Sequence, residues 1–383
     1  MIDFSLTPEQ EAIQRTARDF AQKEIAPAAQ QYDRSGEYPQ EIVKKAFQAG
    51  LVYGPVPEEY GGGGLGQLDQ LIVAEELSAG CAGISTCIAI NSLAAIPLID
   101  RGSEEQKKRI LGGACRDEKL IALCVTEPEA GSDVAAISTR ARRRNGEYVI
   151  SGNKCFITGG GVADYYIVFA TVDPSRGHRG ITAFVVPRGA EGLSVGKKEN
   201  KMGQRAADTT DVIFDEVVVP AADRIGEEGE GFRIIMQTFN RSRPGVAISA
   251  VGVARAALDY ALRYSLERGQ FGAPIFMQQS VMFMLADMAR DITAGRLLAW
   301  KAAWKVEQGL DNSAEAAMAK VFCGDMVMRV TTDAVQVYGG YGYVKDYPVE
   351  KLMRDAKVFQ IYEGTSQVQR LLIGRALAKK VAR

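Results

Sequence analysis

The sequence has 383 residues, 46 of them basic, 47 acidic and one histidine, so its formal net charge is −1. This length indicates two or three domains with an ample core, and the balanced charge excludes a protein that attracts nucleic acid or an anionic membrane through its overall field. The six cysteines never stand at C-x-x-C spacing and the only histidine is His178, so we expect no metal site and, in an enzyme, chemistry carried by a carboxylate, a hydroxyl or a cofactor.

The start of the chain, Met1–Phe4, has neither the basic nor the apolar segment of a secretory signal. Unclustered cysteines in a chain of this length are typical of a reducing compartment. We therefore expect a cytoplasmic protein.

Helical patterns fill the first region, from Thr7 to about Gly113. Thr7-Pro8-Glu9-Gln10 places a cap residue, a first-turn proline and an acceptor at the spacing of a capping box. Gly61, Gly63 and Gly66 match the letters G-x-G-x-x-G, but no strand pattern precedes them, so we interpret them as a connection between helices and not as a dinucleotide-binding turn.

The run from Leu77 to Ile99 carries no charged residue and is long enough to cross a membrane. Its serines, glycines, Thr86, Asn91 and Pro97 make it too polar for lipid. We therefore expect a helix inside the protein, without membrane insertion, whose polar residues line a cavity.

Between about Ile121 and Gly226 the hydrophobic period becomes two, which predicts strands. No helix-length segment separates these strands, so an antiparallel β unit is favoured over a doubly wound sheet. The expected strands are Glu147–Ser151, Tyr165–Phe169, Gly180–Val186 and Thr210–Phe214.

Helical periods return from Phe232 onward, and four long helices indicate a bundle. Glycines at 269, 309 and 339–340 stand where helices are expected to end. The expected helices are Val251–Glu267, Ser280–Glu307, Ala314–Tyr338 and Val349–Val381.

Three segments carry side chains suited to a ligand. Val125–Asp133 is a loop with neutral donors for a diphosphate or a flavin edge, and an ordinary turn is its alternative. In a second loop, Lys154–Gly161, Phe156 and Thr158 are two residues apart and can face one planar heterocycle. In Gln360–Gln367, Glu363 beside Tyr362 is a candidate base whose pKa burial would raise, or else a solvated loop residue.

These residues lie in longer stretches that resemble the acyl-CoA dehydrogenase family over essentially the whole chain. Val125-Thr126-Glu127-Pro128 followed by Ala130–Asp133 resembles its first signature, and Gln336–Gly342 with Tyr347–Glu350 resembles the second. Arg354–Lys357 and Ile361–Thr365 fit as well, and the medium-chain and short-chain (butyryl) members are the most similar.

The resemblance implies an α+β, mostly α fold with an N-terminal helical domain at 1–118, a middle antiparallel β domain at 119–228 and a C-terminal four-helix bundle at 229–383. The three textures found from periodicity agree with this division. It also implies a homotetramer, a dimer of dimers, in which one subunit completes the flavin site of another.

FAD is the cofactor that the resemblance implies. Val125 and Thr126 would contact the flavin pyrimidine side, Ser132 the diphosphate, Phe156 the ring by stacking, and Thr158 the reactive N5. Gly131 is a further cofactor-binding position. Four residues match positions that bind FAD across the dimer interface: Arg268, Phe271, Gln336 and Gly340. Thr365 and Gln367 match residues that also contact FAD. Phe156 replaces the tryptophan frequent in the family.

For the substrate, the resemblance implies an acyl-CoA thioester, with Glu363 as the base that removes the α-proton. Ser242 stands where some relatives carry their base, and a serine cannot replace it. The other matching substrate positions are Thr86, Ser132, Asn240, Arg243, Tyr362 and Gly364.

The wall around Ser85, Thr86, Ala89 and Ile90 holds no basic residue, which argues against dicarboxylates and favours a short- to medium-chain acyl group, with branched or cyclic chains allowed. Electrons would pass to electron-transfer flavoprotein in fatty acid β-oxidation. Two alternatives remain: an acyl-CoA-oxidising flavoprotein oxidase, disfavoured because such oxidases are usually longer, and a non-catalytic helical binding protein of the same fold.

Overall fold

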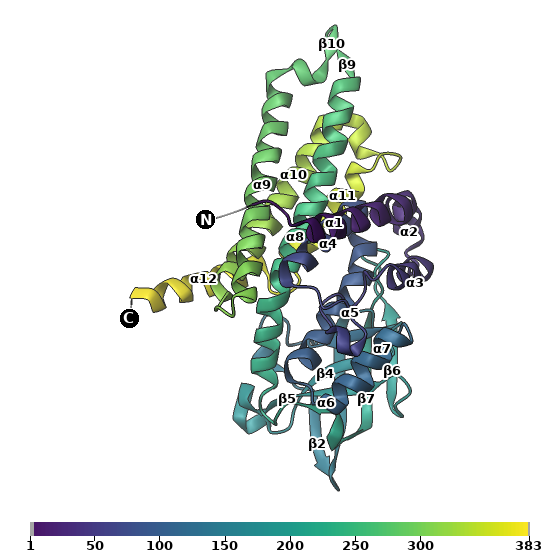
Figure 1. The fold of residues 1–383 in the computed structure, drawn as a ribbon, viewed down its shortest axis with the longest axis vertical. Coiled ribbons are helices and arrows are strands. Elements are labelled where there is room, and N and C mark those ends of the chain that lie inside the picture. Colours follow the sequence, from purple (N-terminus) through teal and green to yellow (C-terminus); the bar gives the residue numbers. More distant parts are fainter. Residues whose placement is uncertain (1–3, 382–383) are drawn as a thin grey trace.

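Helix, sheet and helix follow one another along the chain in the predicted order (Figure 1). The computed structural model describes residues 4–381. Met1–Asp3, on which part of the expectation about a secretory signal depends, lies outside the described residues.

The N-terminal region is helical, as predicted. At its first helix the Thr7 hydroxyl accepts from the Gln10 N–H at 3.2 Å and the Gln10 side chain accepts from the Thr7 N–H at 3.1 Å, which confirms the capping box. Gly61–Gly66 connects a short 3₁₀ turn to the fourth helix, as expected. The helices are α1 (Pro8–Phe20), α2 (Ala29–Ser35), α3 (Gln40–Gln48), α4 (Gln67–Gly80), α5 (Ala82–Arg101), α6 (Glu104–Gln106) and α7 (Gly112–Arg116).

The middle region is a sheet in which β1 (Ile121–Cys124) pairs with β4 and the other strands follow the order β6-β7-β3-β2-β4-β5-β8. Most pairs are antiparallel, but β1 and β2 both pair with β4 in parallel, so the purely antiparallel expectation is corrected there. Periodicity reports which face a residue takes and not the direction of its partner strand. The remaining strands are β2 (Arg140–Arg144), β3 (Glu147–Thr158), β4 (Tyr165–Thr171), β5 (Ile181–Pro187), β6 (Leu193–Lys198), β7 (Thr209–Pro220) and β8 (Arg224–Ile225).

The C-terminal region packs α8 (Gly231–Glu267), α9 (Gln279–Glu307) and α10 (Ser313–Tyr338) together. The fourth helical segment is divided into α11 (Val349–Ala356) and α12 (Ser366–Val381), so the expectation of one helix over Val349–Val381 is corrected. The break contains Glu363 and Gly364, both with positive φ, which an uninterrupted helix does not allow.

Two helices, α5 and α8, are long and apolar enough to cross a membrane by length and composition. In their most apolar windows 67% and 56% of the residues are buried inside the protein. Both pack in the hydrophobic core, where uncharged helices also occur, so their composition does not indicate a membrane span. Beyond α8 a short hairpin, β9 (Gly269–Gln270) and β10 (Ala273–Pro274), forms the tip of the molecule remote from the sheet (Figure 1).

Candidate functional site

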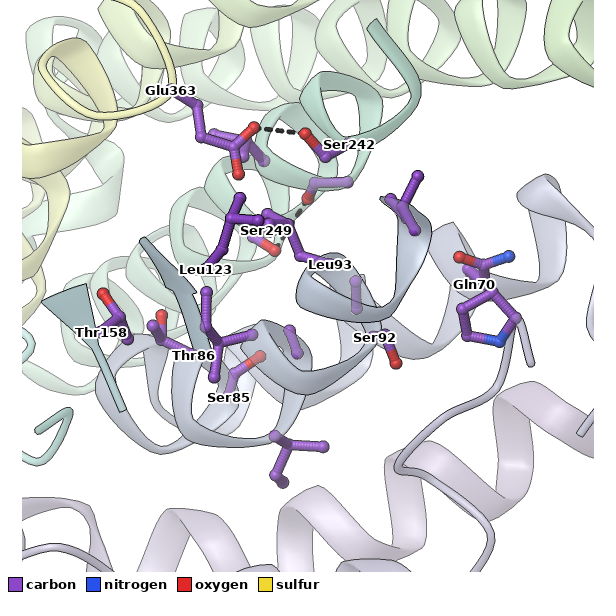
Figure 2. Close-up of a pocket in the computed structure, with 18 of the residues that line it drawn as sticks. Gln70, Ser85, Thr86, Ser92, Leu93, Leu123, Thr158, Ser242, Ser249 and Glu363 are labelled. Atoms are coloured by element: carbon purple, nitrogen blue, oxygen red, sulfur yellow. Dashed lines mark hydrogen bonds between the residues drawn. The ribbon is translucent and has the colours of Figure 1, made fainter. Parts of the chain in front are cut away.

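A cavity of about 270 Å³ lies among α4, α5, β3, α8 and the segment before α12 (Figure 2). It brings together side chains that are far apart in the sequence. Those among the predicted site residues are Thr86, Val125, Thr126, Phe156, Thr158, Tyr362 and Glu363.

Glu363 reaches into this cavity from the break between α11 and α12. Its backbone has φ of 52°, an uncommon conformation for a residue other than glycine that is often found at functional sites. The Ser242 hydroxyl donates to Glu363 Oε2 at 2.5 Å (Figure 2). Burial raises the pKa of Glu363, and the Ser242 hydrogen bond, Arg243 and Lys320 oppose that rise. Glu363 is half-buried, so its carboxyl is a partly enclosed acid–base group in this cavity, which disfavours the solvated-loop alternative.

The peptide segment around Glu363 is held by three side chains. Arg243 Nε donates to the Glu363 carbonyl at 3.2 Å, and Lys320 Nζ donates to the Gly364 carbonyl at 2.6 Å. Gln369 Nε2 donates to both carbonyls, at 3.2 and 3.0 Å. Gly364 has φ of 92°, and a Cβ there would lie 2.5 Å from Gln369 Nε2, so only glycine fits. These contacts fix the direction in which the Glu363 side chain leaves the backbone.

Tyr362 and Thr86 meet through Gln204, a residue that the sequence did not indicate. The Thr86 hydroxyl donates to Gln204 Oε1 at 2.9 Å. Burial raises the pKa of Tyr362 well above its ordinary value, against a hydrogen bond with Gln204. The Tyr362 ring also meets Phe359 edge-on, with 5.5 Å between centroids. The phenol therefore stays neutral and forms a rigid wall beside Glu363.

A buried ion pair between Lys154 and Glu127 stabilises the part of the cavity wall formed by Val125 and Thr126. Lys154 Nζ lies 2.7 Å from Glu127 Oε1 and donates to the Val125 carbonyl at 3.0 Å. Glu127 also accepts from the Ser138 N–H and hydroxyl, both at 2.7 Å. Burial alone would raise the pKa of Glu127, but Lys154 and these hydrogen bonds hold it at about 2. The backbone of Val125 and Thr126 is thus anchored from within the sheet.

Phe156 and Thr158 lie on β3 and not in a loop, which corrects the expectation for Lys154–Gly161. The strand register shifts between Lys154 and Ile157, and Phe156 there has φ of 56° and a side chain that is 65% exposed. An exposed ring held in a strained conformation beside Thr126 and Thr158 is suited to cover by a planar heterocycle. Open space around Gly131 leaves room for a diphosphate, so these residues fit FAD.

The remaining predicted cofactor residues lie elsewhere. Arg268 follows α8 at the tip, with its guanidinium over the Tyr341 ring at 5.6 Å, and Phe271 at the tip is 94% exposed with φ of 54°. Gln336 and Gly340 are exposed at the end of α10. None of these residues lines the cavity around Glu363.

The other predicted residues are not part of the cavity lining. The loop residue Ser132 is exposed, and the Thr365 hydroxyl accepts from the Val368 N–H at the start of α12, where Gln367 is exposed. Asn240 Oδ1 accepts from Arg243 Nη1 at 3.0 Å, and Arg243 is only 4% exposed.

Sequence reasoning missed several residues that shape the site. A lysine within the apolar strand β3 was a usable signal for the Lys154 ion pair, because a buried lysine needs a partner. Lys320, Gln369 and Gln204 carried no such signal. Arg241 also lines the cavity, which corrects the expectation of a wall without a basic residue, but its guanidinium is paired with Asp100.

Comparison with known proteins gives the family. The models of the acyl-CoA dehydrogenase N-terminal, middle and C-terminal domains match residues 7–118, 122–217 and 229–378. Butyryl-CoA dehydrogenase from Megasphaera elsdenii has a similar structure, with a TM-score of 0.96 and 43% identity over 98% of this chain and 100% of that one. A chain from structural work on the electron transferring flavoprotein of Acidaminococcus fermentans is also similar. Its TM-score is 0.96 and its sequence identity 44%, over 98% of this chain and 99% of that one.

The prolyl acyl carrier protein oxidase AnaB is also similar, with a TM-score of 0.94 and 30% identity over 97% of this chain and 100% of that one. This oxidase matches over its whole length, so chain length alone does not separate a dehydrogenase from every kind of oxidase with this fold. The three domain matches, together with an enclosed Glu363 facing the Thr126, Phe156 and Thr158 wall, establish that the chain belongs to the acyl-CoA dehydrogenase family.

Proposed function

We propose that this protein is an FAD-dependent acyl-CoA dehydrogenase that converts a short- to medium-chain acyl-CoA thioester into the trans-2-enoyl-CoA. The observation that carries the proposal is the Glu363 carboxyl, enclosed in one cavity with the side chains suited to a flavin. The cavity contains both a candidate base, Glu363, and the side chains suited to a flavin, which disfavours a non-catalytic binding protein of the same fold.

In this reaction Glu363 accepts the proton from the carbon α to the thioester carbonyl. FAD supplies the acceptor for the β-hydrogen, which leaves with its electron pair. Because burial raises its pKa, the Glu363 carboxylate is a stronger base than a solvated one. Tyr362 and the apolar wall exclude water from the proton transfer.

Charge that develops on the thioester oxygen needs a positioned donor. Within residues 4–381, the Glu363 N–H has no hydrogen-bond acceptor, whereas the carbonyls of Glu363 and Gly364 are both bonded. We assign this free N–H to the thioester oxygen. Arg243, Lys320 and Gln369 hold the segment so that this donor keeps its direction.

Ser242→Ala is expected to shift the acid limb of the kcat/KM profile to higher pH. The hydroxyl stabilises the ionised carboxylate, so its loss raises the pKa of Glu363 further and leaves less base at low pH. The loss of activity will be larger at the acid end than at the alkaline end. Ser242→Thr, which keeps the hydroxyl, should restore the profile, and an unchanged limb in the alanine variant would contradict this role.

Acyl preference and electron acceptor are tested together by anaerobic spectra with a series of acyl-CoAs, followed by turnover with electron-transfer flavoprotein. We expect the flavin to be bleached best by short and medium chains and poorly by palmitoyl-CoA, because the cavity is small. The similarity to AnaB makes an oxidase the second candidate. Steady turnover in air without an added acceptor would favour it.

The proposed assembly rests on the resemblance to the acyl-CoA dehydrogenase family. We propose a homotetramer, a dimer of dimers in the cytoplasm, in which the exposed Arg268, Phe271, Gln336 and Gly340 complete the FAD site of a second subunit. The remoteness of these residues from their own cavity supports this arrangement. We also propose domain boundaries after residues 118 and 228, which fall between α7 and β1 and between β8 and α8.

A further inference from the structure

Polar side chains other than Glu363 also line the cavity. Gln67 and Gln70 of α4 and Ser92 of α5 are among them, and Figure 2 shows Gln70 on the opposite side of the view from Glu363 and Thr158. The lining also contains the apolar side chains of Ile88, Leu93, Leu123 and Val246, of which Figure 2 shows Leu93 and Leu123 between Thr158 and Gln70.

Both glutamine amides are oriented by backbone carbonyls. Gln67 Nε2 donates to the Arg241 carbonyl at 3.2 Å, and Gln70 Nε2 donates to the Leu65 carbonyl at 3.0 Å. A carbonyl oxygen only accepts, so each amide nitrogen must face it and each amide oxygen must point elsewhere. The orientation of these two acceptors is therefore determined by the protein.

The two amide oxygens, and the Ser92 hydroxyl beside them in the lining, receive no hydrogen bond from the described chain. Gln67 is 7% exposed, and in the described chain its Oε1 is buried without a hydrogen-bond partner. Neither Gln70 Oε1 nor the Ser92 hydroxyl has a partner among residues 4–381. Leaving the buried Gln67 acceptor unpaired costs free energy, whereas Gln70 and Ser92 are half-buried and line the cavity, where a ligand donor can bond them.

We propose that the acyl group of the substrate carries a hydroxyl at its end remote from the thioester, bound by Gln70, Gln67 and Ser92. The inference rests on the proposed function and names its substrate class: hydroxylated short- to medium-chain acyl-CoAs. A terminal carboxylate would face two amide oxygens, and the charge of Arg241, the cation in this lining, is paired with Asp100 through Nη1. The Arg241 Nε is buried without a hydrogen-bond partner in the described chain, and a hydroxyl, unlike an ammonium, can both accept from such a donor and donate to an amide oxygen. A terminal ammonium would find no free carboxylate at this end in the described lining.

The test compares kcat/KM for matched pairs: butanoyl- and 4-hydroxybutanoyl-CoA, hexanoyl- and 6-hydroxyhexanoyl-CoA, octanoyl- and 8-hydroxyoctanoyl-CoA. In the unmodified holoenzyme we expect the hydroxylated member to be favoured about tenfold or more for at least one length, because a site built to bond a hydroxyl disfavours the analogue that lacks it. Gln70→Leu should remove the preference while retaining or improving use of the alkyl partner. Gln31→Leu, the same exchange at an exposed position on α2, should keep it.

The outcomes separate the two proposals. Equal kcat/KM within every pair, or a uniform preference for the alkyl member, would overturn the hydroxyl assignment while the dehydrogenase function stands. No flavin bleaching with any thioester would overturn the function itself. Because the comparison within the unmodified protein needs no variant, poor folding of Gln70→Leu does not prevent a decision.

Discussion

Glu363→Gln is expected to lower the rate of flavin reduction by acyl-CoA at least about a thousandfold, because a positioned general base contributes up to roughly four orders of magnitude. Glutamine has the same shape and can accept the Ser242 hydrogen bond, but it cannot take the α-proton. Anaerobic stopped-flow bleaching with hexanoyl-CoA measures the effect.

The same variant should still bind FAD and the enoyl-CoA product, since its backbone contacts to Arg243, Lys320 and Gln369 are unchanged. A visible spectrum of the purified variant and a product titration provide these controls. Near-normal bleaching would remove Glu363 as the base. Loss of bound FAD would instead show that the exchange disturbs the site.

Lys154→Met is expected to destabilise the protein by about 3–5 kcal/mol, the cost of leaving one member of a buried ion pair without its partner. Lys154 is 0% exposed and its ammonium lies 2.7 Å from Glu127. The variant also removes the donor to the Val125 carbonyl, so we expect a lower unfolding midpoint together with a lower FAD content. Thermal unfolding and the flavin-to-protein absorbance ratio measure the two effects.

The double variant Lys154→Met with Glu127→Gln should recover part of the stability, because it no longer buries an unpaired charge. Recovery of stability without recovery of FAD would separate the electrostatic role of the pair from its anchoring of Val125. The pair also predicts a pH dependence. The lowered pKa of Glu127 contributes stability above its ordinary 4.5, and this contribution is lost as the pH falls toward about 2. A double variant no more stable than the single one would contradict the buried-charge explanation.

Much of the fold is encoded locally and was predictable. The capping box at Thr7 uses residues three apart, and the change from helical to strand period near Ile121 is visible in any short window. The parallel pairing of β1 with β4 was not predictable, because partner choice depends on segments more than forty residues apart. The division of the last helical segment depends on backbone angles at Glu363 and Gly364 that tertiary contacts stabilise.

Those site residues that lie within short sequence motifs were predictable. Glu363, Thr126, Phe156 and Thr158 came from short ordered matches, and the structure places them around one cavity. Ser242 was recognised only as unable to replace the base, because nothing in a sequence reports that a hydroxyl 121 positions away lies 2.5 Å from a carboxylate. Gln70 gave no signal either, since its free amide oxygen results from a contact with the Leu65 backbone.

The length of α8 sets a geometric rule for the family site. This helix carries Ser242 about a third of the way along and ends at Glu267, and at about 1.5 Å per residue it rises about 38 Å from Ser242 to that end. One residue inserted in this stretch would turn everything beyond it by about 100°, and the Arg268 guanidinium would then face the wrong side of the tip. An insertion of about seven residues, close to two full turns, would lengthen the helix and leave the direction of the tip nearly unchanged. The length of α8 thus determines both the distance of the tip from Ser242 and the direction in which the tip faces.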